Sequence, residues 1–253
     1  MKKLSLTLIT LALAAAACGT LPSAARAEKP LPTASRAGDG LPHGENSDGS
    51  GDLNNINVTY RGGQLLQNVQ VSTLFMGAAW QGNAFHDYLN KFYVDLFADG
   101  SFMANLAQYN AGGYQIGDGR IVATAWDHRP AAARVSDDEI QAEVVLAIQA
   151  QALPRPGANS LYVVYTAPGT VVVKSDGTDS QNNFYGYHGY VPNSAVGSFA
   201  YAVVAYPTEV WRLTKTSSHE LAEAVTDPQV NAGTLGWYDD QNGEIGDIPV
   251  ALY

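Results

Sequence analysis

The sequence predicts a single α+β domain with a mixed β-sheet. Short runs of β-branched and aromatic residues, which favour strands, are separated by segments whose apolar residues recur at helical spacing. These strands and helices alternate irregularly along the chain, which is typical of the α+β class. About 200 residues follow the N-terminal region, and a chain of that length can form one domain with a sizeable core.

The N-terminus predicts export from the cytoplasm. Two lysines precede an apolar run at residues 4–18, which has the character of a secretory signal and is short for a membrane span. An Ala-x-Ala pattern that ends at Ala27 fits a cleavage site, so residues 1–27 are expected to be removed. In the alternative, Cys18 is lipidated and anchors the protein, although Ala15 stands where that processing prefers a branched apolar residue.

Residues 28–54 are predicted to be a disordered linker, because Pro, Gly, Ser, Asp and Asn dominate this segment without apolar periodicity. The folded domain is expected at residues 55–253. Cys18 is the only cysteine, so the mature domain must hold its core together without disulfides. The signal segment predicts a secreted, periplasmic or cell-surface protein.

The charge balance excludes two classes of partner. The formal net charge is −10, and removal of the signal segment with its three basic residues would make it −13. Nucleic acids and anionic membranes both require basic patches, so neither is an expected partner. No transmembrane segment is predicted in the mature chain. The acidic excess is compatible with cation binding and with solubility outside the cell.

The first half of the domain is expected to hold two strands and two helices. Strands are predicted at residues 56–60 and 69–75, on either side of a turn at Gly62-Gly63. Residues 85–97 carry large apolar side chains at near-helical spacing, and a second helix is expected at residues 101–109.

The second half is expected to add strands around one well-capped helix. A short strand at residues 121–126 precedes a helix from Ser136 to about Gln151, which opens with a capping pattern and carries one apolar stripe. Further strands are predicted at residues 161–165, 171–173 and 199–206.

A short helix at residues 217–228 is the centre of the functional prediction. Ser217 or Ser218 can cap its N-terminus, strong helix formers follow, and an Asp-Pro pair ends it after two to three turns. Leu221 and Val225 lie four residues apart, so they form one apolar face that can pack on a core.

The polar face of this helix resembles a zinc site. In zinc metalloproteases, His-Glu-x-x-His on a helix supplies two zinc ligands and a glutamate that takes a proton from the bound water. Here the pattern is His-Glu-x-x-Glu, and zinc also accepts carboxylate oxygen. We therefore expect His219 and Glu223 to be metal ligands and Glu220 to be the general base of a zincin-like active-site helix. The alternative is a surface helix whose polar side chains are merely solvated.

The third ligand is expected from the acidic segment at residues 236–247. Asn242-Gly243 is a tight-turn signal between two short apolar segments and predicts a hairpin there. The segment carries four carboxylates, and packing so many acids together is unfavourable without a cation. We expect Glu244 or Asp247 to complete the site. His188 is a less favoured ligand, since a buried, hydrogen-bonded histidine explains it equally well.

Several of these motifs resemble a known family. His-Glu-Leu-Ala-Glu-Ala-Val-Thr-Asp-Pro at residues 219–228, followed by Gly-Trp-Tyr-Asp and Glu-Ile-Gly-Asp, is similar to the C-terminal signature of the EXORDIUM-like, phosphate-induced proteins of plants and their bacterial relatives. Residues 58–65 and 185–190 resemble that family's Tyr-x-Gly-Gly opening and Cys-Gly-x-His segment. The resemblance spans roughly residues 56–247.

This resemblance implies a secreted protein, and no settled biochemical activity comes with it. Tyr185 and Ile248 stand where the family usually has cysteines able to pair, so that crosslink would be missing here. The bacterial members look like zinc-dependent peptidases only through the helix motif.

Two functions follow from the sequence. The first is a secreted metal-dependent hydrolase, metallopeptidase-like, that uses Zn²⁺ and acts on a peptide or a cell-wall-associated substrate. The second is a non-enzymatic binding or signalling protein of the cell surface in which the same residues hold a structural cation. The acid-rich segment would favour Ca²⁺ in that case, because calcium prefers oxygen ligands.

Overall fold

The computed structural model describes residues 56–206 and 211–250. The expected signal segment (residues 1–27), the expected linker (residues 28–54) and the alternative lipidation site Cys18 lie outside the described residues. Within the described ranges, no helix is both long and apolar enough to cross a lipid bilayer.

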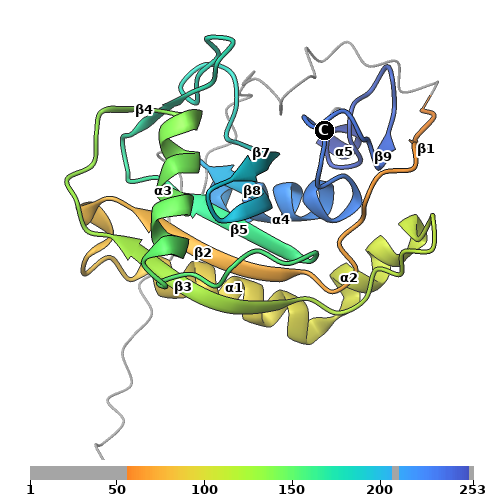
Figure 1. The fold of residues 1–253 in the computed structure, drawn as a ribbon, viewed down its shortest axis with the longest axis horizontal. Helices are drawn as coiled ribbons and strands as arrows, with labels where there is room; N and C mark the ends of the chain where they lie inside the picture. The colour runs from red at the N-terminus through yellow and green to blue at the C-terminus, as the bar shows by residue number, and fades with distance from the viewer. Residues whose placement is uncertain (1–55, 207–210, 251–253) are drawn as a thin grey trace, which may run out of the picture. The chain divides into compact units, whose positions relative to one another are not determined.

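The main sheet has five strands and is mixed (Figure 1). The first four strands in spatial order run parallel to their neighbours, and the last is antiparallel. The predicted α+β fold with a mixed sheet is therefore confirmed. In spatial order the strands are β3 (Arg120–Asp127), β2 (Gln70–Met76), β5 (Ser160–Tyr165), β8 (Gly197–Val204) and β7 (Gly186–Ser194).

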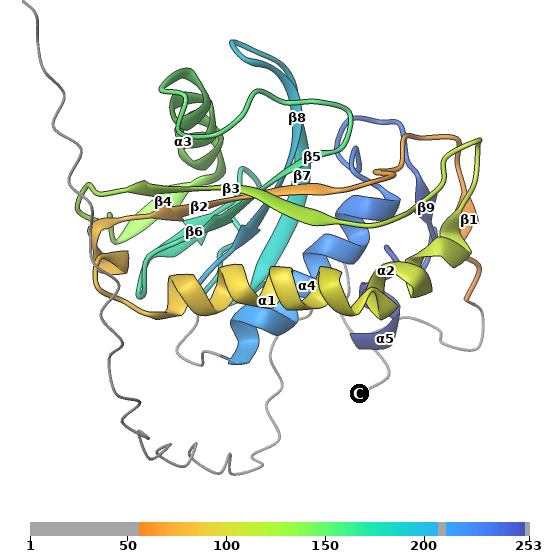
Figure 2. The same cartoon turned by 90° about the horizontal axis from the view of Figure 1, so that it is seen from below.

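Helices cover both faces of this sheet (Figure 2). α1 (Phe85–Asp99) and α4 (Trp211–Thr226) lie on one face, and α3 (Asp137–Gln149) lies on the other. Because successive side chains of a strand point to opposite faces, each face has its own apolar core. Along β5, for example, Val163 belongs to the core under α4 and Val164 to the core under α3.

Two small sheets complete the fold. β1 (Thr59–Tyr60) pairs antiparallel with β9 (Trp237–Tyr238), and β4 (Arg134–Ser136) pairs parallel with β6 (Val171–Val173). The first of these pairings joins the beginning of the domain to its C-terminal segment, so two distant parts of the chain lie side by side.

The helices of the first half, predicted at residues 85–97 and 101–109, are confirmed. The second of them consists of α2 (Ser101–Leu106) and one 3₁₀ turn. The capping pattern of α3 is also confirmed. The hydroxyl of Ser136 accepts the backbone N–H of Glu139, and the carboxylate of Glu139 accepts the backbone N–H of Ser136.

The predicted start of the functional helix is wrong. α4 begins at Trp211, so neither Ser217 nor Ser218 caps it. Ser217 is buried within the helix, where its hydroxyl donates to the carbonyl of Leu213 at 2.6 Å and lies 2.7 Å from the hydroxyl of Tyr165. A serine can satisfy its hydroxyl on the carbonyl four residues earlier, so serine alone does not mark a helix start.

The tight turn predicted within residues 236–247 is confirmed, because Asp239 and Gly243 form one antiparallel bridge with N–H···O distances of 2.9 and 3.0 Å. The hairpin strands predicted on either side of it are wrong, because the partner of β9 is β1. Asp239 instead organises a turn, since its carboxylate accepts the N–H groups of Gln241 and Asn242 at 2.8 and 3.0 Å. The chain then enters the short helix α5 (Asp247–Val250). A turn and a helix start therefore direct the acidic side chains, instead of alternation along a strand.

Gly186 sets the close spacing of β7 and α4. A methyl group on this residue would lie 2.4 Å from Cγ2 of Thr216 and 2.7 Å from the carbonyl oxygen of Val203. That carbonyl belongs to the neighbouring strand and cannot rotate away. We therefore expect Gly186→Ala to lower the free energy of unfolding by about 1–3 kcal/mol, the usual effect of overpacking.

Urea unfolding of the two proteins measures this effect. Gly157→Ala is the matched control, because its new methyl would have only the hydroxyl of Ser160 nearby, at 3.8 Å. If Gly186→Ala were as stable as the control, the close packing of β7 against α4 would be contradicted.

Candidate metal centre

The buried side of α4 fixes the direction of its polar side. Leu221 and Val225 are 1 % and 0 % exposed and pack in the core between the helix and the sheet, as the sequence predicts. His219, Glu220 and Glu223 then face β7 and the segment that follows β9, where other titratable side chains meet them.

His219, Glu223 and Asp247 form what we call the outer group. Nε2 of His219 lies 3.1 Å from Oε1 of Glu223 and 3.6 Å from Oδ1 of Asp247. One ligand atom from each of the three residues lies within 4.8 Å of the others. The side chain of His219 is 14 % exposed, so this group reaches the protein surface.

His188, Glu223 and Glu244 form what we call the inner group. Nδ1 of His188 lies 3.6 Å from Oε2 of Glu223, and its Nε2 lies 3.4 Å from Oε1 of Glu244. The three ligand atoms again lie within 4.8 Å of one another, and all three residues are buried. The structure thus brings both Glu244 and Asp247 to the polar side of α4. We call the two groups together with Glu220 the cluster. The structure also makes His188 a full member, although the sequence favoured it less.

The imidazole of His188 is held on both sides. Its Nε2 lies 3.0 Å from the carbonyl oxygen of Asp227, and its Nδ1 lies 3.7 Å from Oε2 of Glu220. The Asp227 carboxylate in turn accepts the backbone N–H of Gly236 at 2.9 Å. Partners of this kind around a ligand histidine fix the plane of its ring.

Burial changes the ionisation of the cluster. It raises the pKa of Asp247 to about 7, raises the pKa of Glu220, and raises the pKa of Glu244 well above its usual value. Burial also acts to raise the pKa of Glu223, but the two neighbouring histidines outweigh it and the pKa falls. Burial acts to lower the pKa of both histidines, and the surrounding carboxylates raise both above the usual value. Carboxylates outnumber imidazoles here, so cations would stabilise the ionised cluster.

Three buried carboxylate oxygens of the cluster have no hydrogen-bond partner among the described residues. They are Oε2 of Glu220, Oε1 of Glu223 and Oε1 of Glu244. Buried polar atoms are normally satisfied, so each such oxygen requires an explanation. Carboxylate oxygen and imidazole nitrogen are both common ligands of zinc. The cluster could therefore hold a metal ion.

The buried carboxylate of Asp227 should make the folding stability of the metal-free protein depend on pH. Its side chain is 0 % exposed, and burial raises its pKa to about 6. The folded state therefore holds this proton more tightly than the unfolded state. The resulting stability is fully present below pH 3.8, the ordinary pKa of an aspartate side chain, and is lost as the pH rises through about 6. Two pKa units correspond to about 3 kcal/mol.

We expect Asp227→Asn to remove this part of the pH dependence, because asparagine keeps an acceptor for the Gly236 N–H but does not ionise. Urea unfolding in chelator-treated buffer between pH 4 and pH 7 measures it. Asp240→Asn makes the same change at a side chain that is 74 % exposed and serves as the control. Equal slopes for Asp227→Asn and the unsubstituted protein would contradict the prediction.

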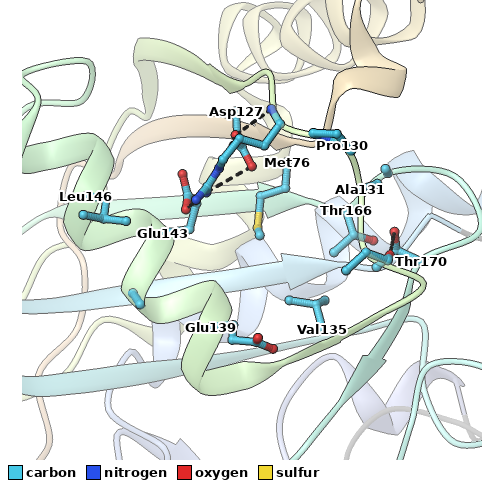
Figure 3. Close-up of a pocket in the computed structure, with 15 residues that line it drawn as sticks. Met76, Asp127, Pro130, Ala131, Val135, Glu139, Glu143, Leu146, Thr166 and Thr170 are labelled. Atoms are coloured by element: carbon cyan, nitrogen blue, oxygen red, sulfur yellow. Dashed lines mark hydrogen bonds and ion pairs between the residues drawn. The ribbon is translucent and has the colours of Figure 1, made fainter.

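A separate cavity of about 370 Å³ lies at the carboxyl ends of β2 and β3 (Figure 3). Ligands often bind outside the carboxyl ends of parallel strands. The charged side chains that line this cavity are already partnered, however. Arg129 pairs with Asp127 at 2.8 Å and with Glu143, while Glu139 caps α3. The histidine and carboxylate cluster is therefore the stronger candidate site.

Comparison with known proteins assigns no family to the chain. The resemblance to the EXORDIUM-like family stays a prediction. No family model matches the sequence, and no curated protein matches it either.

Proposed function

We propose that the protein is an exported metal-dependent hydrolase, metallopeptidase-like, that uses zinc and acts on a peptide or cell-wall-associated substrate. One observation carries the proposal. Buried carboxylate oxygens without hydrogen-bond partners converge with two imidazoles at one place beside α4. The export component rests on the signal-like sequence at residues 1–27.

The residues divide into ligands and a base. His219, Glu223 and Asp247 would hold a metal at the outer group, where the partial exposure of His219 favours an open position for substrate. A bound zinc ion supplies Lewis acidity and lowers the pKa of its water. Glu220 belongs to neither group of three. Its free Oε2 and its raised pKa suit a general base.

The ligand types favour zinc over calcium. Each group contains an imidazole, which suits zinc and other transition metals, whereas calcium takes oxygen ligands almost exclusively.

Glu220→Gln tests the assignment of the base. We expect the variant to retain its metal and to lose hydrolysis of a broad peptide library by about 100-fold or more, the usual contribution of general-base catalysis. Metal analysis and turnover are measured on the same preparation. Glu143→Gln makes the same chemical change at the separate cavity and should keep both properties. Full turnover in Glu220→Gln would contradict the assigned base.

A second candidate function is a non-enzymatic protein with a structural cation. The complete burial of the inner group favours it, since a closed site leaves no position for substrate. The same measurements separate the two functions, because a structural site would bind metal while the unsubstituted protein hydrolysed neither peptides nor cell-wall preparations.

A further inference from the structure

Glu223 belongs to both ligand groups, and its two oxygens face different histidines. Oε1 lies 3.1 Å from Nε2 of His219, whereas Oε2 lies 3.6 Å from Nδ1 of His188. A single cation needs only one of these oxygens. A carboxylate whose two oxygens point at two separate imidazoles has the arrangement of a bridge between two cations.

Each group also has a carboxylate of its own. Asp247 lies beside His219 in the outer group, at 3.6 Å, and Glu244 lies beside His188 in the inner group, at 3.4 Å. The two halves therefore match in the kinds of ligand that they offer, although Glu223 and Glu244 lie beside different nitrogens of His188. Each offers one imidazole, one unshared carboxylate and one oxygen of Glu223.

We propose that the cluster binds two divalent cations, one in each group, with Glu223 as the bridging ligand. This inference rests on the proposed metal-dependent function and adds the number of ions and the residue that they share. Paired cations about 3.5–4 Å apart stabilise both the attacking and the leaving oxygen in many hydrolases.

An independent observation supports an ion in each half. Oε1 of Glu223 faces the outer group and Oε1 of Glu244 faces the inner group, and neither atom has a hydrogen-bond partner among the described residues. The two residues are only 4 % and 5 % exposed, so bulk water does not solvate these atoms. An unsatisfied oxygen in each group is what two ions would require.

The charge of the cluster points the same way. Four buried carboxylates surround the two histidines, which are neutral when they act as ligands. The buried carboxylate of Asp227 adds a further negative charge close to His188. Two divalent cations would offset more of this buried negative charge than one cation would, and unpaired buried charge is unfavourable. The four residues are Glu220, Glu223, Glu244 and Asp247.

Metal stoichiometry of the full chain tests the inference. Protein loaded with Zn²⁺ and freed of excess metal should contain two zinc ions per chain by elemental analysis. Loaded with Mn²⁺, it should show the exchange-coupled electron paramagnetic resonance spectrum of two ions that share a ligand. One ion per chain, or two uncoupled ions, would overturn the bridged pair and leave the proposed function standing. No bound ion would overturn both.

Two conservative variants assign the ions to their groups. Glu244→Gln and Asp247→Asn should each keep one Mn²⁺ ion per chain and lose the exchange coupling, while the exposed control Asp240→Asn keeps two coupled ions. Two ions retained in either variant, or none, would overturn the assignment. Circular dichroism establishes that each variant is folded, and the stoichiometry of the unsubstituted protein decides the number of ions if a variant does not fold.

Discussion

Replacing Glu223 by glutamine is expected to remove nearly all bound metal and, with it, the proposed hydrolase activity. The amide carries no charge and offers only one oxygen, so one group would lose a ligand outright and the other would keep only a neutral one. Loss of an outer-shell partner already lowers metal affinity by about 10–100-fold, and loss of a shared ligand should exceed that in both groups. Zinc titration with elemental analysis measures the affinity, and peptide turnover measures the activity.

Glu143→Gln is the control for this substitution, because it makes the same chemical change on α3, where the carboxylate pairs with Arg129. It should bind zinc like the unsubstituted protein. Normal zinc content in Glu223→Gln would show that the cluster is not the metal site, whatever the result at position 143.

Gly246→Ala is expected to disturb the metal site without changing any ligand. A methyl group on this residue would lie 2.6 Å from Oε1 of Glu223 and 2.9 Å from Nδ1 of His219. It would push these two side chains apart in the outer group. We expect the variant to lose one ion per chain, from the outer group, and at least about tenfold in kcat/KM, since small displacements of catalytic groups have effects of up to about 100-fold.

Elemental analysis and peptide turnover again provide the measurement. Gly157→Ala, whose methyl meets nothing closer than 3.8 Å, is the matched control and should retain both metal and activity. A Gly246→Ala protein with its full metal content would contradict the placement of Gly246 against the outer group.

The local part of the site could be predicted from the sequence. His219 and Glu223 lie four residues apart, so any helix through them presents both on one face. Leu221 and Val225 form a different, apolar face that must be buried against a core. This burial fixes the rotation of the helix about its own axis. The acidic residues that follow the Asn242-Gly243 turn could also be predicted as ligands beside this helix. The turn signal and the number of carboxylates in the segment are enough for that prediction.

The part that depends on topology could not be predicted in the same way. His188 reaches the cluster because β7 is the last strand of the sheet and α4 packs against it. The order of the strands in a sheet cannot be read from the spacing of residues in the sequence. Gly186 was the available signal. A methyl on it would lie 2.9 Å from Oε1 of Glu220, and a glycine inside a strand often marks a place where another part of the molecule approaches the backbone closely. The start of α4 was missed because a serine inside a helix can bond the carbonyl four residues earlier, as Ser217 does with Leu213.

The pairing of β1 with β9 has a consequence for the order of maturation. The N–H of Asn57 donates to the carboxylate of Asp239 at 2.5 Å, across 182 residues of sequence. The segment with Glu244 and Asp247 can therefore dock only when both ends of the domain have come together, and a chain that has not yet paired β1 with β9 lacks the unshared carboxylate of each group. We expect the metal ions to bind in the last step of folding, so that a chain with bound metal is a fully folded one.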